Sequence, residues 1–319
     1  MTSLQILELT ELHDFKSPKG ANVFFYKTLD GVNLRVSIWN KDSKKGSLLL
    51  QSGRTEFTEK YFEVIDEFLQ RDLCVAMFDW RGQGLSDRLT KNRFIGHVND
   101  FSEYDKEFQE ILKEVYSDLC PKPWIGMGHS MGGCLLVSAE VKNPNSFDAM
   151  ILSAPMLSMH ISTKNEILAL IVGFLSKLGF RDQPFETPEW DEIKGWHERP
   201  FEENEVTSDK KRYERSANLL RKNEKLAVGG LTIGWVHEAI KRIRLIRRSK
   251  WLEKIKCPTL LLNATKDQLV SSSLNKKMCS KNTNIIVVDI EGEHELFMEK
   301  DHIRIKTWKE VDKFLKRIL

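Results

Sequence analysis

The chain has 319 residues, of which 41% are hydrophobic and 30% are charged. This composition fits a soluble globular protein with a large buried core, and it excludes a disordered chain, a collagen-like fibre and a multi-span membrane protein. Lysine plus arginine number 49 and aspartate plus glutamate number 46, and the resulting net charge of +3 is too small to indicate nucleic-acid binding.

The first half of the chain alternates short apolar runs with helical patterns. Alternating or continuous apolar runs predict strands, and continuous runs are typical of strands that are covered on both faces. Apolar residues at helical spacing predict the helices between them. Strands are expected at residues 33–39, 47–51, 73–78, 124–127 and 149–152, and helices at 57–69, 101–115 and 130–141. This order predicts a parallel sheet with crossover helices.

The pattern stops near Ala154 and resumes with strands expected at 259–263 and 284–290, followed by a last helix. The intervening residues show helical periodicity, clustered charges and no clear strand. We therefore expect a helical insertion over the carboxyl ends of the strands. This divides the chain into a first core part (1–154), a helical cap or lid (155–255) and a second core part (256–319).

Cellular location can be inferred only from general features. The five cysteines form no CxxC pair, which favours reduced thiols in a cytosolic protein. The first residues are acidic and do not resemble a secretion signal. The longest strongly apolar run, Ile167 to Leu175, is too short to span a membrane. We expect a cytoplasmic protein that can still contact the inner membrane surface.

The strongest local signal is the segment GMGHSMGG, which places the pattern G-x-S-x-G at Gly128, Ser130 and Gly132. An expected strand precedes it and an expected helix follows, which is the position of a nucleophile elbow. Side chains two residues either side of the serine would collide in so tight a turn, so glycine is needed there. The serine then lies in a strained conformation at a helix N-terminus, which favours an anion.

This segment has two other interpretations besides the nucleophile elbow. A glycine-rich turn between a strand and a helix also arises by chance. A nucleotide-binding loop fits poorly, because Met131 occupies the third glycine position of G-x-G-x-x-G and no G-K-[ST] follows.

A serine hydroxyl is an effective nucleophile only when an oriented base removes its proton. After a nucleophile elbow, the acid and then the histidine are expected directly after later strands. Asp267 follows the strand at 259–263, and His294 follows the strand at 284–290. These two residues are the predicted partners of Ser130.

Other titratable residues fit these roles less well. His302 is the main rival to His294, but it falls within the expected last helix. His97 precedes a helix, where a surface or capping role is favoured. Asp289 lies inside its strand, and Glu291 and Glu293 are too close in sequence to the histidine.

A tetrahedral oxyanion needs about two fixed N–H donors. One is expected to be the backbone of Met131, directly after the nucleophile. The other is expected from the loop after the strand at 47–51, where Gly53 permits close approach and the Arg54 N–H is the candidate. The alternative for this loop is an ordinary strand-to-helix turn.

Together these residues resemble the α/β-hydrolase family, and most closely its bacterial lysophospholipase and monoacylglycerol lipase-like branch. The resemblance runs from about residue 20 to the end and is also carried by GRTEF (53–57), DWRGQGLSD (79–87), GHVNDF (96–101), AVGGLTIGW (227–235) and His294-Glu295. It implies an α/β-hydrolase fold: a mostly parallel central sheet flanked by helices, with a helical lid inserted before the last two strands.

The resemblance also guides two local interpretations. Many relatives carry histidine before the glycine of the oxyanion loop, where this chain has Ser52; a backbone donor survives that change, but its support differs. The segment 79–87 is expected to be a structural loop, with Arg81 and Asp87 fixing neighbouring loops, rather than a second active site.

The insertion is expected to form the substrate pocket. The segment 167–180 is apolar on more than one face and either is buried or lines an acyl channel. Trp190, Trp196, Phe201 and Trp235 either contact an acyl chain or form the core of the lid. Residues 241–256 contain eight basic side chains and one acid, so this segment either binds an anionic membrane or phosphate headgroup, or is a solvated lid helix.

Candidate substrate-binding residues are Gly53, His129 and Trp235. The His129 side chain, next to the serine, is nevertheless expected to point away from the site.

These observations predict a serine ester hydrolase that acts through a Ser130–His294–Asp267 triad and an acyl-enzyme. No HExxH or paired cysteine–histidine pattern predicts a metal, and no cofactor is expected. The expected substrate is a single-chain glycerolipid, foremost a lysophospholipid. The alternatives are a monoacylglycerol lipase, a general carboxylesterase, or a non-catalytic ligand-binding protein with the same fold. The expected partners are this lipid and an anionic membrane surface, with no nucleic acid.

Overall fold

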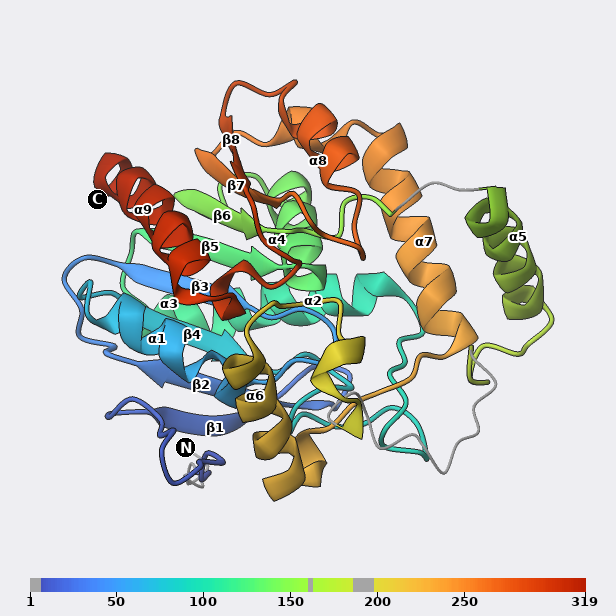
Figure 1. Ribbon diagram of the computed structural model, residues 1–319, viewed down its shortest axis with the longest axis horizontal. Helices are drawn as coiled ribbons and strands as arrows, with labels where there is room; N and C mark the ends of the chain where they lie inside the picture. The colour runs from blue at the N-terminus through green and yellow to red at the C-terminus, as the bar shows by residue number, and fades with distance from the viewer. Residues whose placement is uncertain (1–6, 160–162, 186–197) are drawn as a thin grey trace.

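The computed structural model of the chain describes residues 7–159, 163–185 and 198–319. Within these residues an eight-stranded sheet has the strand order β1-β2-β4-β3-β5-β6-β7-β8 (Figure 1). The strands are β1 (Asn22–Lys27), β2 (Asn33–Trp39), β3 (Ser47–Gln51), β4 (Cys74–Phe78), β5 (Trp124–His129), β6 (Ala149–Ser153), β7 (Thr259–Ala264) and β8 (Ile285–Ile290). β2 is antiparallel to β1 and β4, and every pairing from β4 to β8 is parallel.

Helices cover both faces of the sheet. The core helices are α1 (Phe62–Leu69), α2 (Phe101–Ile111), α3 (Ser117–Leu119), α4 (Met131–Lys142), α8 (Ser272–Cys279) and α9 (Asp301–Ile318), with a 3-10 turn before α1 (Thr58–Tyr61) and a π-helical turn between α2 and α3 (Leu112–Tyr116). One face packs against α1 and α9 through residues such as Phe68 and Trp308. The other packs against α2 and α4 through residues such as Phe108 and Leu135. The mostly parallel central sheet flanked by helices that was expected from the sequence is confirmed.

The expected elements match the observed ones closely. The parallel strands β3 to β7 are fully buried, which is why continuous apolar runs located them. Among the elements of the sheet layer, β1 and α8 were not predicted. β1 is an edge strand with exposed Phe25, and α8 is a mostly polar helix that buries only Asn275 and Cys279, so neither has a strong hydrophobic pattern.

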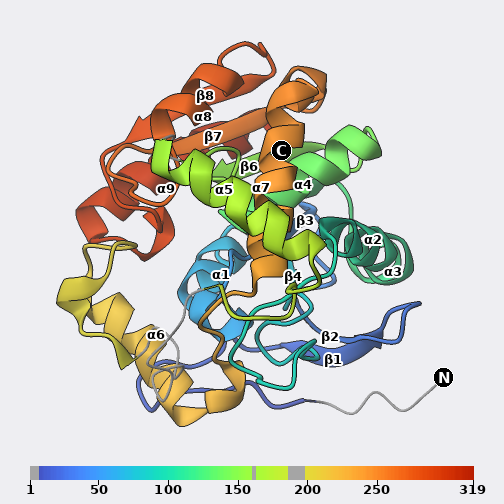
Figure 2. The same ribbon diagram turned by 90° about the vertical axis from the view of Figure 1, so that its right-hand side faces the viewer.

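The residues between β6 and β7 form a helical layer of their own. Its helices are α5 (Thr163–Lys177), α6 (Lys210–Lys222) and α7 (Ile233–Arg248), with short 3-10 turns at Phe201–Glu203, Glu224–Leu226 and Trp251–Lys254. α5 packs on α7 and lies across it in Figure 2, whereas α6 lies beside α1 and the start of α9 (Figure 1). The boundaries expected at 154 and 255 fall in the connections that follow β6 and precede β7, and they stay predictions.

Part of the basic segment 241–256 is used inside the molecule. The Arg242 guanidinium is buried and lies 2.6 Å from an Asp105 carboxylate oxygen. Lys241 pairs with Asp100 and Glu238, each at 2.9 Å. The basic side chains from Arg247 onward remain exposed, and the Lys241 side chain is itself 56% exposed despite its ion pairs. In the described part of the chain, no helix is both long and apolar enough to cross a bilayer.

Candidate active site

Ser130 occupies a sharp turn between β5 and α4. Its backbone angles are φ 49° and ψ −116°, a region that a residue with a side chain rarely adopts. Such strain persists only where the surroundings enforce it, and it is typical of functional turns. The Ser130 N–H donates to the Ser153 carbonyl at 3.1 Å, and its own carbonyl accepts from Cys134 and Met156. The serine backbone is therefore fixed by β6 and by α4.

The flanking glycines are required by contact distances. A Cβ on Gly128 would lie 2.6 Å from the Gly133 Cα, and a Cβ on Gly132 would lie 2.3 Å from the Gln51 carbonyl oxygen. Both values are well below van der Waals contact. The elbow thus packs directly against the end of β3, which brings the serine next to the loop that follows β3.

Asp267 and His294 meet at the carboxyl ends of β7 and β8. The His294 Nδ1 lies 2.6 Å from the Asp267 Oδ2, and both side chains are buried. The other carboxylate oxygen accepts the N–H groups of Leu269 and Val270 at 2.8 and 2.9 Å. Burial alone would raise the pKa of Asp267, but the hydrogen bond and charge of His294 and these backbone N–H groups lower it. The carboxylate is therefore ionised and orients the imidazole.

The imidazole of His294 lies next to the residue that precedes the serine. Its ring centroid is 4.6 Å from that of His129, in an edge-on arrangement. Among the residues that the structure describes, no hydrogen bond joins the Ser130 hydroxyl to His294. Such bonds are commonly long in unliganded enzymes and shorten when substrate binds. The contact between Ser130 and His294 stays a prediction.

The expectation that His129 points away from the site is wrong. Its ring is buried against His294, and its Nδ1 lies 3.2 Å from the Ser153 carbonyl oxygen. Burial, with the charges of His294 and Lys60, lowers the pKa of His129 to about 4. A neutral His129 thus packs beside His294, and a substrate-binding role for it stays a prediction.

The oxyanion loop is held from both sides by residues that the sequence did not single out. The Gly53 N–H donates to the Glu56 carboxylate, and the Gly53 carbonyl accepts from the Gln83 amide at 3.2 Å. A Cβ on Gly53 would lie 3.1 Å from the Ser130 Cβ, tighter than an ordinary contact, so glycine favours this close approach of the loop to the serine.

Both oxyanion donors stay predictions, but their surroundings are defined. Met131 is the first residue of α4, so its N–H has no carbonyl partner one turn earlier in that helix. The Arg54 side chain extends toward the insertion, where it donates to the Gly229 carbonyl at 2.8 Å and lies 5.9 Å from the Trp235 ring.

A buried ionic cluster lies behind this loop. The Lys60 ammonium contacts Glu56 at 2.9 Å and Glu295 at 2.5 Å, and the Tyr61 hydroxyl donates to Glu56 at 2.7 Å. Burial would raise the pKa of Glu56, but Lys60 and His129 lower it to about 2. Glu56, His129 and Glu295 are close enough to bind a metal ion together, but the Lys60 ammonium already pairs with both carboxylates and would repel a cation.

The aromatic residues of the insertion are only partly described. Trp235 is buried and packs edge-on against Phe101, with ring centroids 5.6 Å apart. Phe201 packs edge-on against Tyr213, with ring centroids 5.6 Å apart. Trp190 and Trp196 lie outside the described residues. A substrate-binding role for Trp235 and Gly53 stays a prediction.

The structure also shows the positions of the residues that the sequence disfavoured as members of the triad. His302 lies in α9, as expected, and Asp289 pairs with Lys276 and Asn263 at the surface. His97 binds Thr232 of the insertion at 2.8 Å. The 79–87 loop is structural, as expected: Arg81 binds Glu107, Asp30 and Glu103, while Asp87 binds Asn33.

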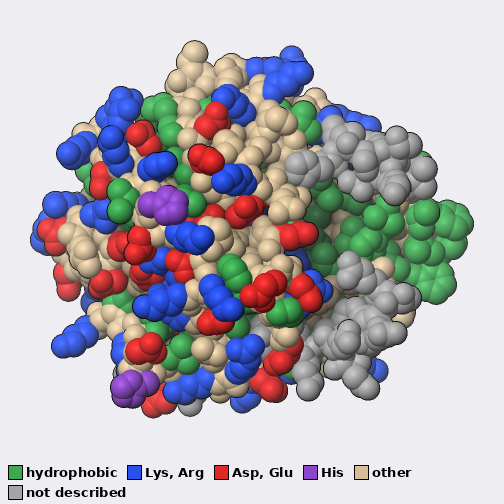
Figure 3. Space-filling model, viewed as in Figure 1, with side chains coloured by type: hydrophobic (Ala, Val, Ile, Leu, Met, Phe, Trp, Pro, Cys, Tyr) green, Lys and Arg blue, Asp and Glu red, His purple; other side chains and the backbone are tan. Residues whose placement is uncertain are grey.

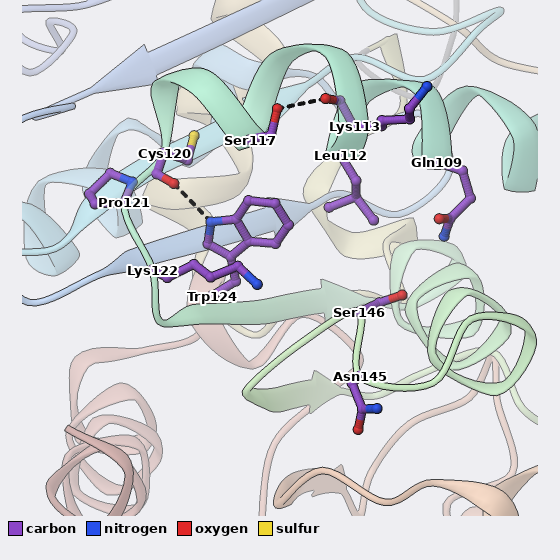
Figure 4. Close-up of a pocket in the computed structure, with 10 residues that line it drawn as sticks. All are labelled: Gln109, Leu112, Lys113, Ser117, Cys120, Pro121, Lys122, Trp124, Asn145 and Ser146. Atoms are coloured by element: carbon purple, nitrogen blue, oxygen red, sulfur yellow. Dashed lines mark hydrogen bonds between the residues drawn. The ribbon is translucent and has the colours of Figure 1, made fainter.

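A surface hollow of about 490 Å³ lies at the other end of β5, near Trp124 (Figure 4). Its polar side chains largely bind within the protein, as in the bond from Ser117 to the Lys113 carbonyl and from the Trp124 indole to the Cys120 carbonyl. None of the predicted site residues lines it. The candidate site is therefore the cluster at the carboxyl ends of β3, β5, β7 and β8.

The chain is similar to known proteins in sequence and in fold. Residues 42–301 match the family model described as serine aminopeptidase, S33. The lysophospholipase L2 of Escherichia coli is 28% identical over 290 residues, which are 86% of this chain and 82% of that protein. The monoacylglycerol lipase of Mycolicibacterium smegmatis is 29% identical over 149 residues, 46% of this chain and 51% of that protein.

Solved structures share the fold. A soluble variant of the monoglyceride lipase from Saccharomyces cerevisiae, in complex with a substrate analogue, superimposes with a TM-score of 0.72 at 18% identity. The match covers 97% of this chain and 100% of that chain.

Proposed function

The chain belongs to the serine aminopeptidase S33 family of α/β-hydrolases, and on this basis we propose that it is a serine ester hydrolase with Ser130, His294 and Asp267 as its catalytic triad. The observation that carries the proposal is the buried 2.6 Å bond between Asp267 and His294, placed beside the strained Ser130 turn. An oriented, ionised carboxylate is what an imidazole base requires.

The proposed reaction uses these groups in two half-reactions. The Ser130 oxygen bonds to the ester carbonyl carbon while His294 takes the hydroxyl proton and Asp267 stabilises the imidazolium. The N–H groups of Met131 and Arg54 hold the resulting oxyanion. Collapse breaks the bond to the alcohol, which leaves with the proton of His294. Water then attacks the acyl-enzyme through the same base, releasing the fatty acid and regenerating Ser130.

Labelling with a fluorophosphonate probe tests the triad. Wild-type protein is expected to be labelled at Ser130, and Ser130→Ala to lose the label. Asp267→Asn leaves the imidazole badly oriented and is expected to slow labelling by about 10³- to 10⁴-fold. Asp289→Asn, a surface carboxylate in the neighbouring strand, is the matched control and is expected to label at the wild-type rate. Wild-type protein that does not react would support the non-catalytic alternative.

The proposed substrate is a glycerolipid with one acyl chain, foremost a lysophospholipid. Support comes from the lysophospholipase L2 of E. coli, which matches over most of both chains. A monoacylglycerol lipase is the second candidate, because the shorter match to the M. smegmatis enzyme has similar identity. Hydrolysis rates of lysophosphatidylcholine, monoacylglycerol and short-chain esters separate the two from a general carboxylesterase, for which short esters would be the best substrates.

We also propose peripheral contact with an anionic membrane through the insertion. Beyond its packed face, α5 exposes large apolar side chains, including Leu170 (69% exposed) and Phe174 (63% exposed). These gather in the hydrophobic region at the position of α5 in Figure 3. The end of α7 adds exposed Arg247 and Arg248. Apolar insertion combined with basic side chains is typical of proteins that bind anionic bilayers.

Sedimentation with lipid vesicles tests this contact. The double substitution Leu170→Glu and Phe174→Glu is expected to reduce binding to all vesicles, because both side chains lose their apolar contact. Reversing the charges of Arg247 and Arg248 to glutamate is expected to reduce only the preference for anionic lipid. Wild-type protein without that preference would contradict the electrostatic part of the proposal.

A further inference from the structure

The loop that carries His294 is hydrogen-bonded to the insertion. The Glu295 N–H, directly after the histidine, donates to the Val206 carbonyl at 2.8 Å. The Thr207 hydroxyl donates to the Met298 carbonyl at 2.7 Å. Val206 and Thr207 come from the segment before α6, about 90 residues earlier in the chain. A part of the insertion is thus built into the wall of the histidine loop.

Glu299 completes this connection from the other side. Its side chain is fully buried, and its Oε1 accepts the N–H of Glu293, directly before the histidine, at 2.7 Å. Its Oε2 accepts the Ser208 N–H at 3.1 Å and also the Ser208 hydroxyl. The residues on both sides of His294 are therefore held through backbone N–H groups, one by Glu299 and one by Val206.

The segment from the insertion is itself fixed. The Asn204 side chain accepts the N–H groups of Val206 and Thr207, each at 3.0 Å. Asp209 caps α6 by accepting the Arg212 N–H at 2.9 Å, and Arg212 donates to the Glu299 carbonyl at 3.0 Å. The contact is thus made by a segment whose own geometry is determined, as a positioning element requires.

We propose that Glu299 is a positioning residue that joins Val206–Ser208 of the insertion to the loop of His294 and so sets the orientation of the base. This inference rests on the proposed role of His294. It gives the insertion a part in the chemical step as well as in substrate binding. Loss of the connection consequently lowers kcat by the same factor for every ester, whatever its chain length.

Glu299→Gln isolates this role with almost no change in shape. Both carboxylate oxygens accept from donors, so an amide places its NH₂ group against either the Glu293 N–H or the Ser208 N–H. Ser208→Ala removes only the hydroxyl donor on the side of the insertion. Glu291→Gln is the matched control, because Glu291 is exposed in the same loop and pairs with Lys266.

The experiment compares kcat and KM for p-nitrophenyl acetate and for a long-chain monoacylglycerol. Glu299→Gln is expected to lower kcat about 10- to 100-fold for both substrates, with KM within about twofold, because a small displacement of the base affects only the reaction step. Ser208→Ala is expected to lower kcat about three- to tenfold, again equally for both. Glu291→Gln is expected to match wild type.

Proton NMR gives a second readout that reports on the base itself. The far-downfield Nδ1 proton of the His294–Asp267 bond is expected to shift or broaden in Glu299→Gln and Ser208→Ala but not in Glu291→Gln. If Glu299→Gln does not fold, Ser208→Ala decides by the same two measurements.

Three results would overturn the proposal: an unchanged kcat in the folded variants, a loss confined to the long-chain substrate, or an unchanged Nδ1 resonance. Wild-type protein that hydrolyses neither ester and is not labelled at Ser130 would instead refute the proposed function.

Discussion

Gly132 occupies a position where one added carbon would collide with the end of β3. A Cβ would lie 2.3 Å from the Gln51 carbonyl and 2.6 Å from the Ser52 carbonyl, both backbone atoms that cannot move alone. We predict that Gly132→Ala lowers the free energy of unfolding by about 1–3 kcal/mol, although alanine favours helix. Because the serine and the oxyanion loop move apart, hydrolysis of p-nitrophenyl acetate is expected to fall at least about 100-fold.

A matched glycine controls for the change in helix propensity. Gly173 lies within α5, where the nearest atom to an added Cβ is 3.7 Å away, an ordinary contact distance. Gly173→Ala is expected to keep wild-type activity toward the short ester and to be equally or more stable in urea unfolding. Equal activity of the Gly132 and Gly173 variants would show that the elbow does not need its close contact with β3.

The burial of His129 is expected to make the stability of the folded protein depend on pH. Its pKa is lowered to about 4 in the folded protein, from an ordinary value of 6.5, because burial disfavours the charged ring. Between pH 6.5 and 4 the unfolded chain therefore binds more protons at this residue than the folded protein does. Its stabilising contribution is complete above pH 6.5 and is lost as the pH falls, by at most about 1.4 kcal/mol per pH unit.

Urea unfolding between pH 4 and 7 measures this effect. His129→Gln is expected to show a flatter dependence of the unfolding free energy on pH than wild type. His302→Gln, which changes an exposed histidine in α9, is expected to follow the wild-type curve. Parallel curves for wild type and His129→Gln would contradict the buried, neutral state of His129.

Sequence position was sufficient to nominate some residues of the site but not others. Ser130 and Asp267 follow the fully buried strands β5 and β7, and His294 follows the partly exposed edge strand β8. The carboxyl ends of these parallel strands meet at one edge of the sheet. Lys60 and Glu299 have no such marker, because their roles depend on partners far away in sequence: Glu295 for Lys60, and Ser208 for Glu299. The four-residue spacing of Glu56 and Lys60 was the only available signal.

Elements were predictable where burial leaves a simple pattern. Parallel strands that are covered on both faces appear as continuous apolar runs in the sequence. Amphipathic helices such as α2 have apolar residues at helical spacing. The sequence pattern did not predict which side chains of the basic segment 241–256 are buried. Its charges predicted either binding to an anionic membrane or phosphate headgroup, or a solvated lid helix. Arg242 is instead buried with Asp105, and only tertiary contacts reveal that pairing.

One carboxylate is shared by several of the ion pairs that attach α6 to the core. Glu63 of α1 contacts Arg212 at 2.7 Å, Arg215 at 2.6 Å and Arg304 at 3.1 Å. Glu63→Ala leaves these three guanidinium groups without their shared acceptor, and we predict a loss of about 1–3 kcal/mol in the free energy of unfolding. Asp66→Ala, at an exposed position of the same helix, is expected to change it by less than about 0.5 kcal/mol.

The pH dependence of this attachment gives an independent check. Burial would raise the pKa of Glu63, but the three arginines lower it to about 2, from an ordinary value of 4.5. The contribution of Glu63 is therefore complete above pH 4.5 and is lost as the pH falls toward 2. The difference between wild type and Glu63→Ala should shrink over that range; a constant difference would contradict the ionic attachment.

At the scale of the whole molecule, the insertion consists of two differently attached parts. α6 and the segment before it bind α1, α9 and the loop of His294 through ion pairs and hydrogen bonds. α5 packs on α7, burying Ala169 and Val172, and exposes much of its apolar surface. The sequence indicated one undivided helical insertion. It could not distinguish the two parts, because helical periodicity does not reveal which helix binds the catalytic core.

This difference predicts unequal local stability within the insertion. Segments with few buried contacts open at lower free energy than segments held by many. We therefore expect the backbone amides of α5 to exchange with deuterium faster than those of α6, measured by mass spectrometry of peptic peptides. Peptides from α9 serve as the reference, because that helix packs on the sheet through Val311 and Phe314.

Anionic vesicles extend the same measurement to the proposed membrane contact. If Leu170 and Phe174 enter the bilayer, exchange in α5 should slow in the presence of vesicles, while exchange in α6 and α9 stays unchanged. The Leu170→Glu and Phe174→Glu protein should lose that protection and keep the exchange pattern of α6. Equal slowing of α5 and α6 would mean that the lipid stabilises the insertion as one unit, because two independently attached parts would respond separately.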